Sequence, residues 1–394
     1  MKRVFLVVLD GVGIGEMDDA ALYNDKGANT LLSVSKSKYF SIPNLVNLGL
    51  FNVDSIPIKL KVDFPLASFA KMKEISKGKD TLTGHFEMAG LEISKPFSVF
   101  PNGFSHEIIE RFESLTGHKV VCNKPYSGIS VIKDFGEHHI KTKDLIVYTS
   151  ADSVFQVAAH ENIIPIEKLY KFCETARSVL TKDYNIARII ARPFTGSLGC
   201  FKRVKRKDYS VLPHDVTMLD QLKSSKFDVI AVGKIGDIFT YEGVTAWKHT
   251  SCNKQGIDDL IDNIQNNSFE GLYFLNLSDF DTLYGHRNDF DGFAKALSKF
   301  DKNISLIINS LKKEDMLIIT ADHGCDPCFP STDHSREHVP LLVCGPKIKK
   351  GVNLGIRSTF SDVGSSILNY FGIKPKIKGT SFLDLILPKE EVQT

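Results

Sequence analysis

Short apolar segments alternate with amphipathic segments along much of this chain. Runs typical of buried parallel strands occupy residues 4–9, 227–232, 272–277, 316–320 and 341–344. Between them, stretches such as 256–265 and 290–311 place apolar side chains at three- and four-residue spacing, which predicts helices. This alternation of strand and helix predicts an α/β fold with a doubly wound sheet.

The middle of the chain follows a different pattern. Residues 105–117 and 167–180 read as helices, and residues 145–149 and 186–191 read as strands. We therefore expect two parts, a discontinuous catalytic core of residues 1–95 plus 214–394 and an inserted α+β cap of residues 96–213. The cap would set substrate specificity.

Composition and charge exclude several classes of protein. The 394 residues are 42% hydrophobic and 24% charged, as in soluble globular proteins, and their number suggests two or three domains. A net charge of +2 gives no reason to expect nucleic acid or a membrane as partner, and no obligate protein partner is inferred. The apolar run that Asp10 ends is too short for a signal segment, so a cytoplasmic location is expected.

Cysteines and basic runs have ordinary interpretations. Seven cysteines without a secretory signal indicate reduced thiols. Cys325 and Cys328 form a C-x-x-C that we interpret as unpaired loop thiols, with metal contact and redox chemistry as the alternatives. The basic runs 202–207 and 347–350 are interpreted as solvated surface.

Six acidic and histidine residues lie at or beyond strand ends. Since ligands bind at the carboxyl ends of the strands in an open α/β sheet, one edge could gather all six. Each has a structural alternative as a turn, cap or loop residue, and His338 rivals His334 by composition. The six are Asp10, Asp281, His286, Asp322, His323 and His334.

Their side-chain types predict the chemistry. Mixed carboxylate and imidazole ligands without thiolate suit manganese, zinc or a similar ion. Two such ions about 4 Å apart form a clamp for in-line phosphoryl transfer, and sulfuryl transfer is the related alternative. Thr81 and Thr83, in the polar loop GKDTLTGHFE, are the candidate nucleophiles, although this motif also reads as a helix cap.

The motifs together resemble the alkaline phosphatase superfamily and, within it, the bacterial-type phosphopentomutase family. The resemblance runs in family order from residue 4 to about residue 343. It rests on VVLDGVGIGEMDDA, SKGKDTLTGHFEMAGL, YTSADSVFQVAAHE, ARPFTG, VGKIGDIF, NLSDFDTLYGHRND, ADHGCDP and TDHSREHVPLLV.

The resemblance implies roles for individual residues. One Mn²⁺ would be held by Asp281, His286 and His334, and a second Mn²⁺ by Asp10, Asp322 and His323. Thr81 would carry the phosphoryl group, with Thr83 as the fallback. Substrate contacts would come from Ser150, Asp152 and Val154 to the ribose, from Arg188 to the distal phosphate with Arg192 as its rival, and from Lys234 to a phosphate.

The implied reaction is the interconversion of ribose 1-phosphate and ribose 5-phosphate, and of the 2-deoxyribose equivalents. It would use a phosphothreonine enzyme, a bound 1,5-bisphosphate and a sugar bisphosphate activator, either ribose 1,5-bisphosphate or glucose 1,6-bisphosphate. The alternatives are a metal-dependent phosphatase or another phosphomutase on the same core and, more remotely, a non-catalytic metal-binding relative. The chain departs from the family pattern in the loop 122–129 and at Phe86, Cys325 and Ser335.

Overall fold

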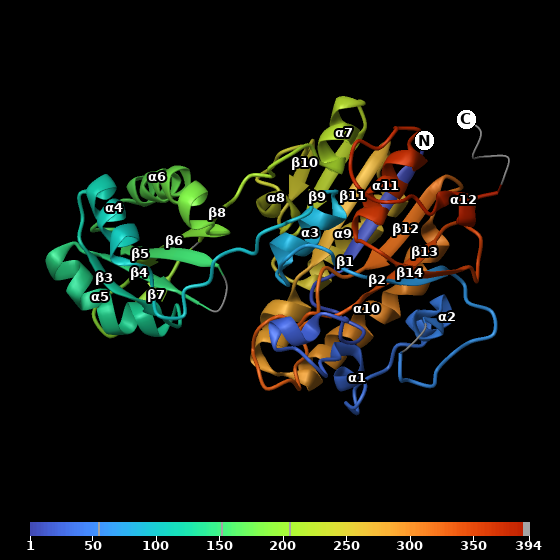
Figure 1. The fold of residues 1–394 in the computed structure, drawn as a ribbon, viewed down its shortest axis with the longest axis horizontal. Helices are drawn as coiled ribbons and strands as arrows, with labels where there is room; N and C mark the ends of the chain where they lie inside the picture. The colour runs from blue at the N-terminus through green and yellow to red at the C-terminus, as the bar shows by residue number, and fades with distance from the viewer. Residues whose placement is uncertain (54–55, 151–152, 205, 389–394) are drawn as a thin grey trace. The chain divides into compact units, whose positions relative to one another are not determined.

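The computed structural model describes residues 1–53, 56–150, 153–204 and 206–388. It divides into two compact units (Figure 1). Unit 1 comprises Met1–Lys95 and Pro213–Thr394, and unit 2 is Pro96–Leu212. The boundary inferred from the sequence placed the end of the insertion one residue later, at 213.

Unit 1 is built on an eight-stranded sheet in the order β10-β9-β11-β1-β12-β13-β2-β14. Its strands are β1 (Arg3–Leu9), β2 (Ser68–Met72), β9 (Asp228–Val232), β10 (Ala246–Lys248), β11 (Gly271–Leu277), β12 (Asp315–Thr320), β13 (Val339–Cys344) and β14 (Asn353–Arg357). Five neighbouring strands, from β10 to β12, run parallel, and each of the five predicted apolar runs is a strand. The central strand β1 is buried along its whole length, as its apolar sequence requires.

One strand direction was predicted wrongly. Residues 341–344 were read as a parallel strand, but β13 is antiparallel to both β12 and β2. The connection agrees with this direction, because β12 and β13 are joined by a loop without the helix that usually connects neighbouring parallel strands.

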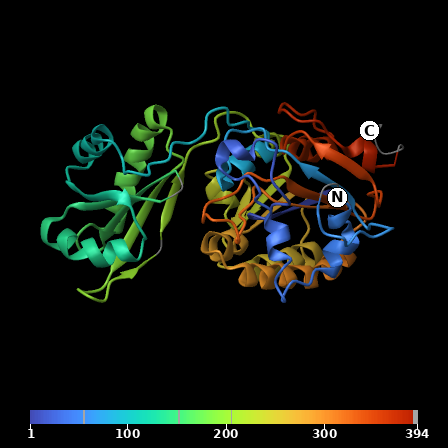
Figure 2. The same cartoon turned by 60° about the horizontal axis from the view of Figure 1, so that its bottom comes forward.

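Helices cover both faces of this sheet, as a doubly wound fold requires (Figure 2). Alternate side chains of β11 show the two faces: Phe274 stacks on the ring of His85 in one helix, whereas Leu275 and Leu277 face Gly256 of another. The helices and helical turns of unit 1 are η1 (Ala20–Tyr23), α1 (Thr30–Val34), α2 (Pro43–Leu48), η2 (Leu50–Asn52), α3 (Thr81–Met88), α7 (Met218–Ser224), α8 (Ile235–Ile238), α9 (Asn253–Asn266), η3 (Phe280–Tyr284), η4 (Gly285–Arg287), α10 (Phe290–Ser310), α11 (Ser361–Tyr370) and α12 (Leu383–Ile386). Helix α10 contacts α1, α2 and α9, while α11 contacts α3 and α7.

Unit 2 has its own sheet and its own core. Its strands are β3 (Val120–Pro125), β4 (Leu145–Thr149), β5 (Val154–His160), β6 (Arg188–Thr195), β7 (Lys202–Arg203) and β8 (Lys207–Ser210), in the order β3-β4-β5-β6-β7 with β8 also paired to β6. Helices α4 (His106–Thr116) and α6 (Ile166–Tyr184) cover one face and α5 (Ser130–Thr142) covers the other. Ser105 caps α4 by accepting a hydrogen bond from the Ile108 amide, and Gly117 ends it in the left-handed conformation.

None of the helices in the described part of the chain combines the length and apolar character needed to cross a membrane.

A buried arginine joins three elements of unit 1. Arg3, 3% exposed, donates from Nε to Asp315 Oδ1 over 2.8 Å, which ties β1 to β12. Its Nη1 and Nη2 groups donate to the carbonyl oxygens of Asn263, Ile264 and Asn267, at the end of α9. The guanidinium thus satisfies orphan carbonyls of the helix as well as a buried carboxylate.

We expect Arg3→Met to lower the free energy of unfolding by about 3–5 kcal/mol, because it leaves the Asp315 carboxylate buried without its partner. Urea unfolding followed by the fluorescence of Trp247, the only tryptophan of the chain and part of unit 1, measures this loss. Lys254→Met, which removes an exposed ion pair with Asp258, is the control and should leave the urea midpoint almost unchanged. Equal midpoints for the two variants would contradict the role of Arg3.

Candidate metal centre

Three adjacent strands end at one place and bring the predicted ligands together. Asp10 directly follows β1, whose neighbours are β11 and β12. Asp281 follows β11, in the π-helical turn η3, a rare conformation that occurs frequently at functional sites. Asp322 and His323 follow β12. The parallel alignment of the strands thus places three carboxylates at the carboxyl edge of the sheet.

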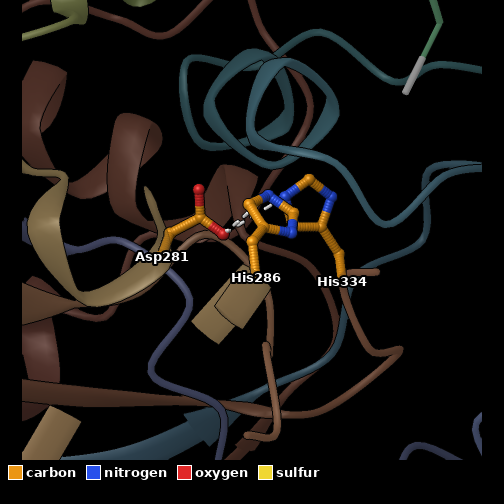
Figure 3. A group of neighbouring side chains, drawn as sticks. All are labelled: Asp281, His286 and His334. Atoms are coloured by element: carbon orange, nitrogen blue, oxygen red, sulfur yellow. Dashed lines mark ion pairs between the residues drawn. The ribbon is translucent and has the colours of Figure 1, made fainter. Parts of the chain in front are cut away.

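The first group of ligands is Asp281, His286 and His334 (Figure 3). Asp281 Oδ1 lies 3.3 Å from Nε2 of His286 and 3.3 Å from Nε2 of His334. The Nδ1 atom of His286 donates to the Thr332 carbonyl over 2.6 Å, so its Nε2 keeps a lone pair for a cation. These three residues are the expected set for one metal ion.

The second group lies around Nε2 of His323. Asp10 Oδ1 and Asp322 Oδ2 each lie 3.3 Å from this atom. Asp10, Asp281 and His323 also have ligand atoms within 4.8 Å of one another. The family resemblance implied Asp281 for the other ion alone, whereas the geometry allows this carboxylate to serve both groups.

The residues fit a divalent cation. Three buried carboxylate oxygens of the predicted ligands make no hydrogen bond in the described part of the chain: Asp10 Oδ1, Asp281 Oδ1 and Asp322 Oδ2. Unpartnered buried acceptors are costly, and a few others, such as Glu74 Oε1 and Asn276 Oδ1, lie outside the ligand set. A bound cation would supply the missing partner of the three ligand oxygens.

Electrostatics keeps the carboxylates charged despite their burial. Burial opposes the charge of Asp10, but the Lys234 ammonium and His323 together hold the pKa of Asp10 below its ordinary value. Lys234 Nζ lies 2.9 Å from Asp10 Oδ2 and 3.9 Å from Asp281 Oδ2. Burial also opposes the charge of Asp281, and His334 and His286 nevertheless hold its pKa well below the ordinary value. Ionised carboxylates are the form that binds a metal ion.

His323 carries a proton in the absence of metal. Burial disfavours its charged form, but the carboxylates of Asp322 and Asp10 prevail and raise the pKa of His323 well above its ordinary value. Its Nδ1 donates to the Gly324 carbonyl over 3.0 Å, so Nε2 is the atom that faces the carboxylates. A cation at this position would take the place of that proton.

Helix α3 brings a hydroxyl to the same place. Asp80 caps the helix, since its Oδ1 accepts hydrogen bonds from the amides of Leu82 and Thr83. Thr81, the first residue of the helix, is partly exposed, and its Oγ1 lies 3.1 Å from His323 Nε2. The Thr83 hydroxyl is buried and donates to Asp80 Oδ2 over 2.6 Å.

The loops that carry the site are cross-linked. Gly324 and Ser335 form a two-way backbone bridge of 3.1 and 2.8 Å, which holds the segment after β12 against the segment that bears His334. Buried Arg336 donates to the Gly78 carbonyl over 2.6 Å, just before the α3 loop. Lys79 pairs with Asp333 at 3.2 Å. The segment 321–338, which bears His323 and His334, is therefore joined by hydrogen bonds to residues 78–79, just before α3.

Other predicted residues lie elsewhere. Ser150, Val154 and Arg188 belong to unit 2, and Asp152 falls outside the described residues. The rival ligand His338 has Nδ1 bonded to the Glu16 carbonyl at 3.1 Å and belongs to neither ligand group.

Cys325 is buried against the ligands. Burial raises the pKa of this thiol well above its ordinary value, and the carboxylates of Asp281 and Asp10 raise it further, so the sulfur stays protonated. Cys328 is exposed, and neither sulfur belongs to a candidate ligand group.

Sequence reasoning missed the supporting residues. His85, Asn276 and Arg336 are buried beside the ligands or their loops, and none was singled out. For His85 and Arg336 the signal was available, because both stand inside the motifs GHFEM and TDHSRE. Asn276 gave a weaker signal, as the one polar residue in the last half of an apolar strand.

Comparison with known proteins identifies the family. The model of the Metalloenzyme superfamily matches residues 2–375. The phosphopentomutase of Lachnoclostridium phytofermentans is 54% identical over 392 residues, covering 99% of this chain and 100% of the relative. That of Dictyoglomus thermophilum is 53% identical over 388 residues, covering 98% and 99%. The chain belongs to the phosphopentomutase family. It is an isomerase that acts on small sugar phosphates and depends on a divalent metal, as expected.

The fold of this phosphopentomutase family member is also found in a solved structure. Phosphoglycerate mutase of Leishmania mexicana, solved at low cobalt concentration, superimposes with a TM-score of 0.51 and 11% identity, covering 96% of this chain and 97% of the other. The expected alkaline-phosphatase-like α/β core with an inserted α+β unit is confirmed.

The raised pKa of His323 predicts that metal binding releases a proton. At pH 7 the metal-free site holds this proton, so cation affinity should rise about tenfold per pH unit until the pH reaches that pKa. Calorimetric titration of Mn²⁺ in buffers of different ionisation enthalpy counts the protons, and we expect about one for the His323 site. His286→Gln should retain this release and His323→Gln should lose it; the opposite pattern would refute the assignment.

Proposed function

We propose that the enzyme interconverts ribose 1-phosphate and ribose 5-phosphate, and the 2-deoxyribose equivalents, by passing a phosphoryl group through Thr81. The distance of 3.1 Å between Thr81 Oγ1 and His323 Nε2 supports this most directly, because it places one hydroxyl at the ligand cluster. The site also lies at the amino end of α3, whose free amides favour an incoming phosphate.

Hydrogen bonding favours Thr81 over Thr83 as the nucleophile. The Thr83 proton is committed to Asp80 Oδ2, and its side chain is fully buried. Thr81 has no such commitment to the cap and is partly exposed. A nucleophile needs access to the substrate, and a hydroxyl beside a bound divalent cation would lose its proton more readily.

Six residues are proposed to hold two Mn²⁺ ions, one by Asp281, His286 and His334 and the other by Asp10, Asp322 and His323. When bound, such ions stabilise charge on the attacking and leaving oxygens of a phosphoryl transfer. The Lys234 ammonium, beside Asp10 and Asp281, is proposed to bind an oxygen of the transferred phosphate. Its position beside the carboxylates supports this role, because the same ammonium can bridge to a phosphate dianion.

The cycle conserves both phosphoryl groups. A sugar bisphosphate, ribose 1,5-bisphosphate or glucose 1,6-bisphosphate, first phosphorylates Thr81. The phosphoryl then passes from Thr81 to the free hydroxyl of the bound monophosphate, giving a 1,5-bisphosphate. Thr81 takes back the phosphoryl from the other end, which leaves the isomerised product and the phosphorylated enzyme.

We assign recognition of the sugar and its distal phosphate to unit 2. Val154 and Arg188 are register partners at the start of β5 and β6, and Ser150 follows the end of β4, so these residues share one end of the sheet. Asp152, outside the described residues, stands between Ser150 and Val154 in the sequence and is proposed to contact the ribose with them. Exclusion of water by this unit would make the enzyme a mutase and not a phosphatase.

The charge of unit 2 supports phosphate binding. A hollow of about 680 Å³ is lined by four basic residues, Arg192, Lys202, Arg203 and Arg206, together with apolar side chains. Arg192, the rival of Arg188 for the distal phosphate, is held by Gln156, to which its Nε donates over 3.0 Å. Arg188 lies 3.9 Å from Asp208. Arg188 is the register partner of Val154, at the end of the sheet that carries the other proposed sugar contacts, whereas Arg192 stands four residues further along β6. We therefore retain Arg188 as the distal-phosphate residue.

The seven free cysteines are compatible with a reducing compartment, and we place the activity in the cytoplasm.

One assay separates a mutase from a phosphatase. The protein is incubated with Mn²⁺, a trace of glucose 1,6-bisphosphate and ribose 5-phosphate, and ribose 1-phosphate and inorganic phosphate are both followed. We expect isomerised sugar in large excess over inorganic phosphate, since the phosphoryl returns to the enzyme in each cycle. Free phosphate in excess over isomerised sugar would refute the mutase cycle.

Thr81→Ala should abolish both turnover and the labelled phosphoenzyme. Labelling uses a bisphosphate with radioactive phosphate, followed by mapping of the labelled peptide. Thr83→Val is the matched variant: it should keep the label at residue 81 and cost about 1 kcal/mol of stability through the lost bond to Asp80. If the Thr81→Ala protein still became labelled, the assignment of Thr81 would be wrong and Thr83 would be the nucleophile.

A further inference from the structure

A fully buried histidine stands behind the candidate metal centre. His85 lies on α3, one helical turn after Thr81, and its side chain has no exposed surface. Its ring stacks on Phe274 of β11, with centroids 5.8 Å apart and planes inclined by 25°. A phenylalanine would satisfy this packing, so the polar atoms of the imidazole need a separate explanation.

Both ring nitrogens have partners that belong to the site. Nδ1 lies 2.8 Å from the Thr81 carbonyl oxygen and 3.2 Å from Asp322 Oδ2. The carbonyl can only accept, so Nδ1 carries the proton and Nε2 is an acceptor. Nε2 lies 3.4 Å from Nδ2 of Asn276, which is a donor.

Asn276 continues the chain to the other carboxylate. Its Nδ2 also donates to Asp10 Oδ2 over 3.1 Å. Because an amide nitrogen has two protons, one can go to Asp10 and the other to His85. Hydrogen bonds therefore link Thr81 through His85 and Asn276 to Asp10, and Asp322 Oδ2 approaches the same His85 Nδ1 to 3.2 Å.

Helix α3 is docked closely against the segment after β12. A Cβ atom on Gly84 would lie 2.1 Å from the Asp322 carbonyl oxygen, so the backbone of α3 lies directly against the backbone of Asp322. The ring of Phe274 packs against the face of the His85 imidazole. His85 is therefore held beside both Phe274 and Asp322.

We propose that His85 and Asn276 are positioning residues, which set Asp10 and Asp322 for one metal ion and hold the first turn of α3, with Thr81, in register with that ion. The inference rests on the proposed ligand and nucleophile roles. Neither side chain touches substrate or metal in this scheme. They determine where the carboxylates and the hydroxyl stand relative to one another, as hydrogen-bonded residues behind metal ligands do in general.

His85→Phe keeps the ring and its stacking but removes both hydrogen bonds. Calorimetric titration of metal-stripped protein with Mn²⁺ should show the affinity of one of two sites lowered by about 10- to 100-fold, with the other site unchanged. Asp10→Asn and His286→Gln serve as references that identify the two sites, and the weakened site should be the one lost in Asp10→Asn. Turnover should fall through kcat, with KM for ribose 5-phosphate within about twofold, because unit 2 is unaltered.

The chain offers a matched control. His139 in unit 2 is equally buried, with Nδ1 bonded to the Asp144 carbonyl at 2.6 Å and Nε2 accepting from the His160 amide at 2.9 Å. His139→Phe removes the same two bonds away from the ligands, so both Mn²⁺ affinities should stay at the wild-type value. Asn276→Leu breaks the path from its other side, and its effect should not add to that of His85→Phe.

The outcomes separate the inference from the function on which it rests. Two wild-type sites in His85→Phe, or equal weakening of both sites, would overturn the positioning role. Wild-type protein that binds no Mn²⁺, or an Asp10→Asn variant with both sites intact, would refute the ligand assignment itself. If His85→Phe does not fold, Asn276→Leu carries the same test, and unchanged affinity there would overturn the inference.

Discussion

The structure depends on one electrostatic constraint: three carboxylates are buried within a few ångströms of one another. Asp10, Asp281 and Asp322 are at most 2% exposed, and each would repel the others in a medium of low dielectric constant. Protonated His323 and the Lys234 ammonium offset part of this charge. Divalent cations can offset the rest, so the same ions that serve the chemistry also relieve the fold of a repulsion built into its centre.

The part of the site that follows from strand ends could be predicted from the sequence. Apolar runs followed directly by acidic residues mark the edge of a parallel sheet, and Asp10, Asp281 and Asp322 do lie at one edge. This holds because parallel strands all present their carboxyl ends on the same side. Helix α10 was predicted as well, since its apolar face repeats at helical spacing. Division of the ligands between two ions depends on differences of about an ångström, which no sequence pattern specifies.

The supporting residues could not be predicted because their signal is three-dimensional. Asn276 points from β11 to Asp10 only because β1 lies beside it in a particular register. The edge strand β14 was missed because it carries few apolar side chains, and the direction of β13 was misjudged because an apolar run has the same appearance in either orientation. Registry, strand direction and hydrogen-bond paths are set by tertiary packing.

The position of β1 in the sheet also constrains how the chain is made. This strand leaves the ribosome before its partners, since in the described structure it pairs only with β11 and β12, which begin at residues 271 and 315. At a synthesis rate of about 5–20 residues per second, this strand with its apolar side chains stays unpaired for roughly 15–60 s, until both partners have been made. Unit 2 is complete well before then and has its own core. Strand β1 is therefore still unpaired when all of unit 2 has been made, and this apolar strand is the segment that most needs protection during translation.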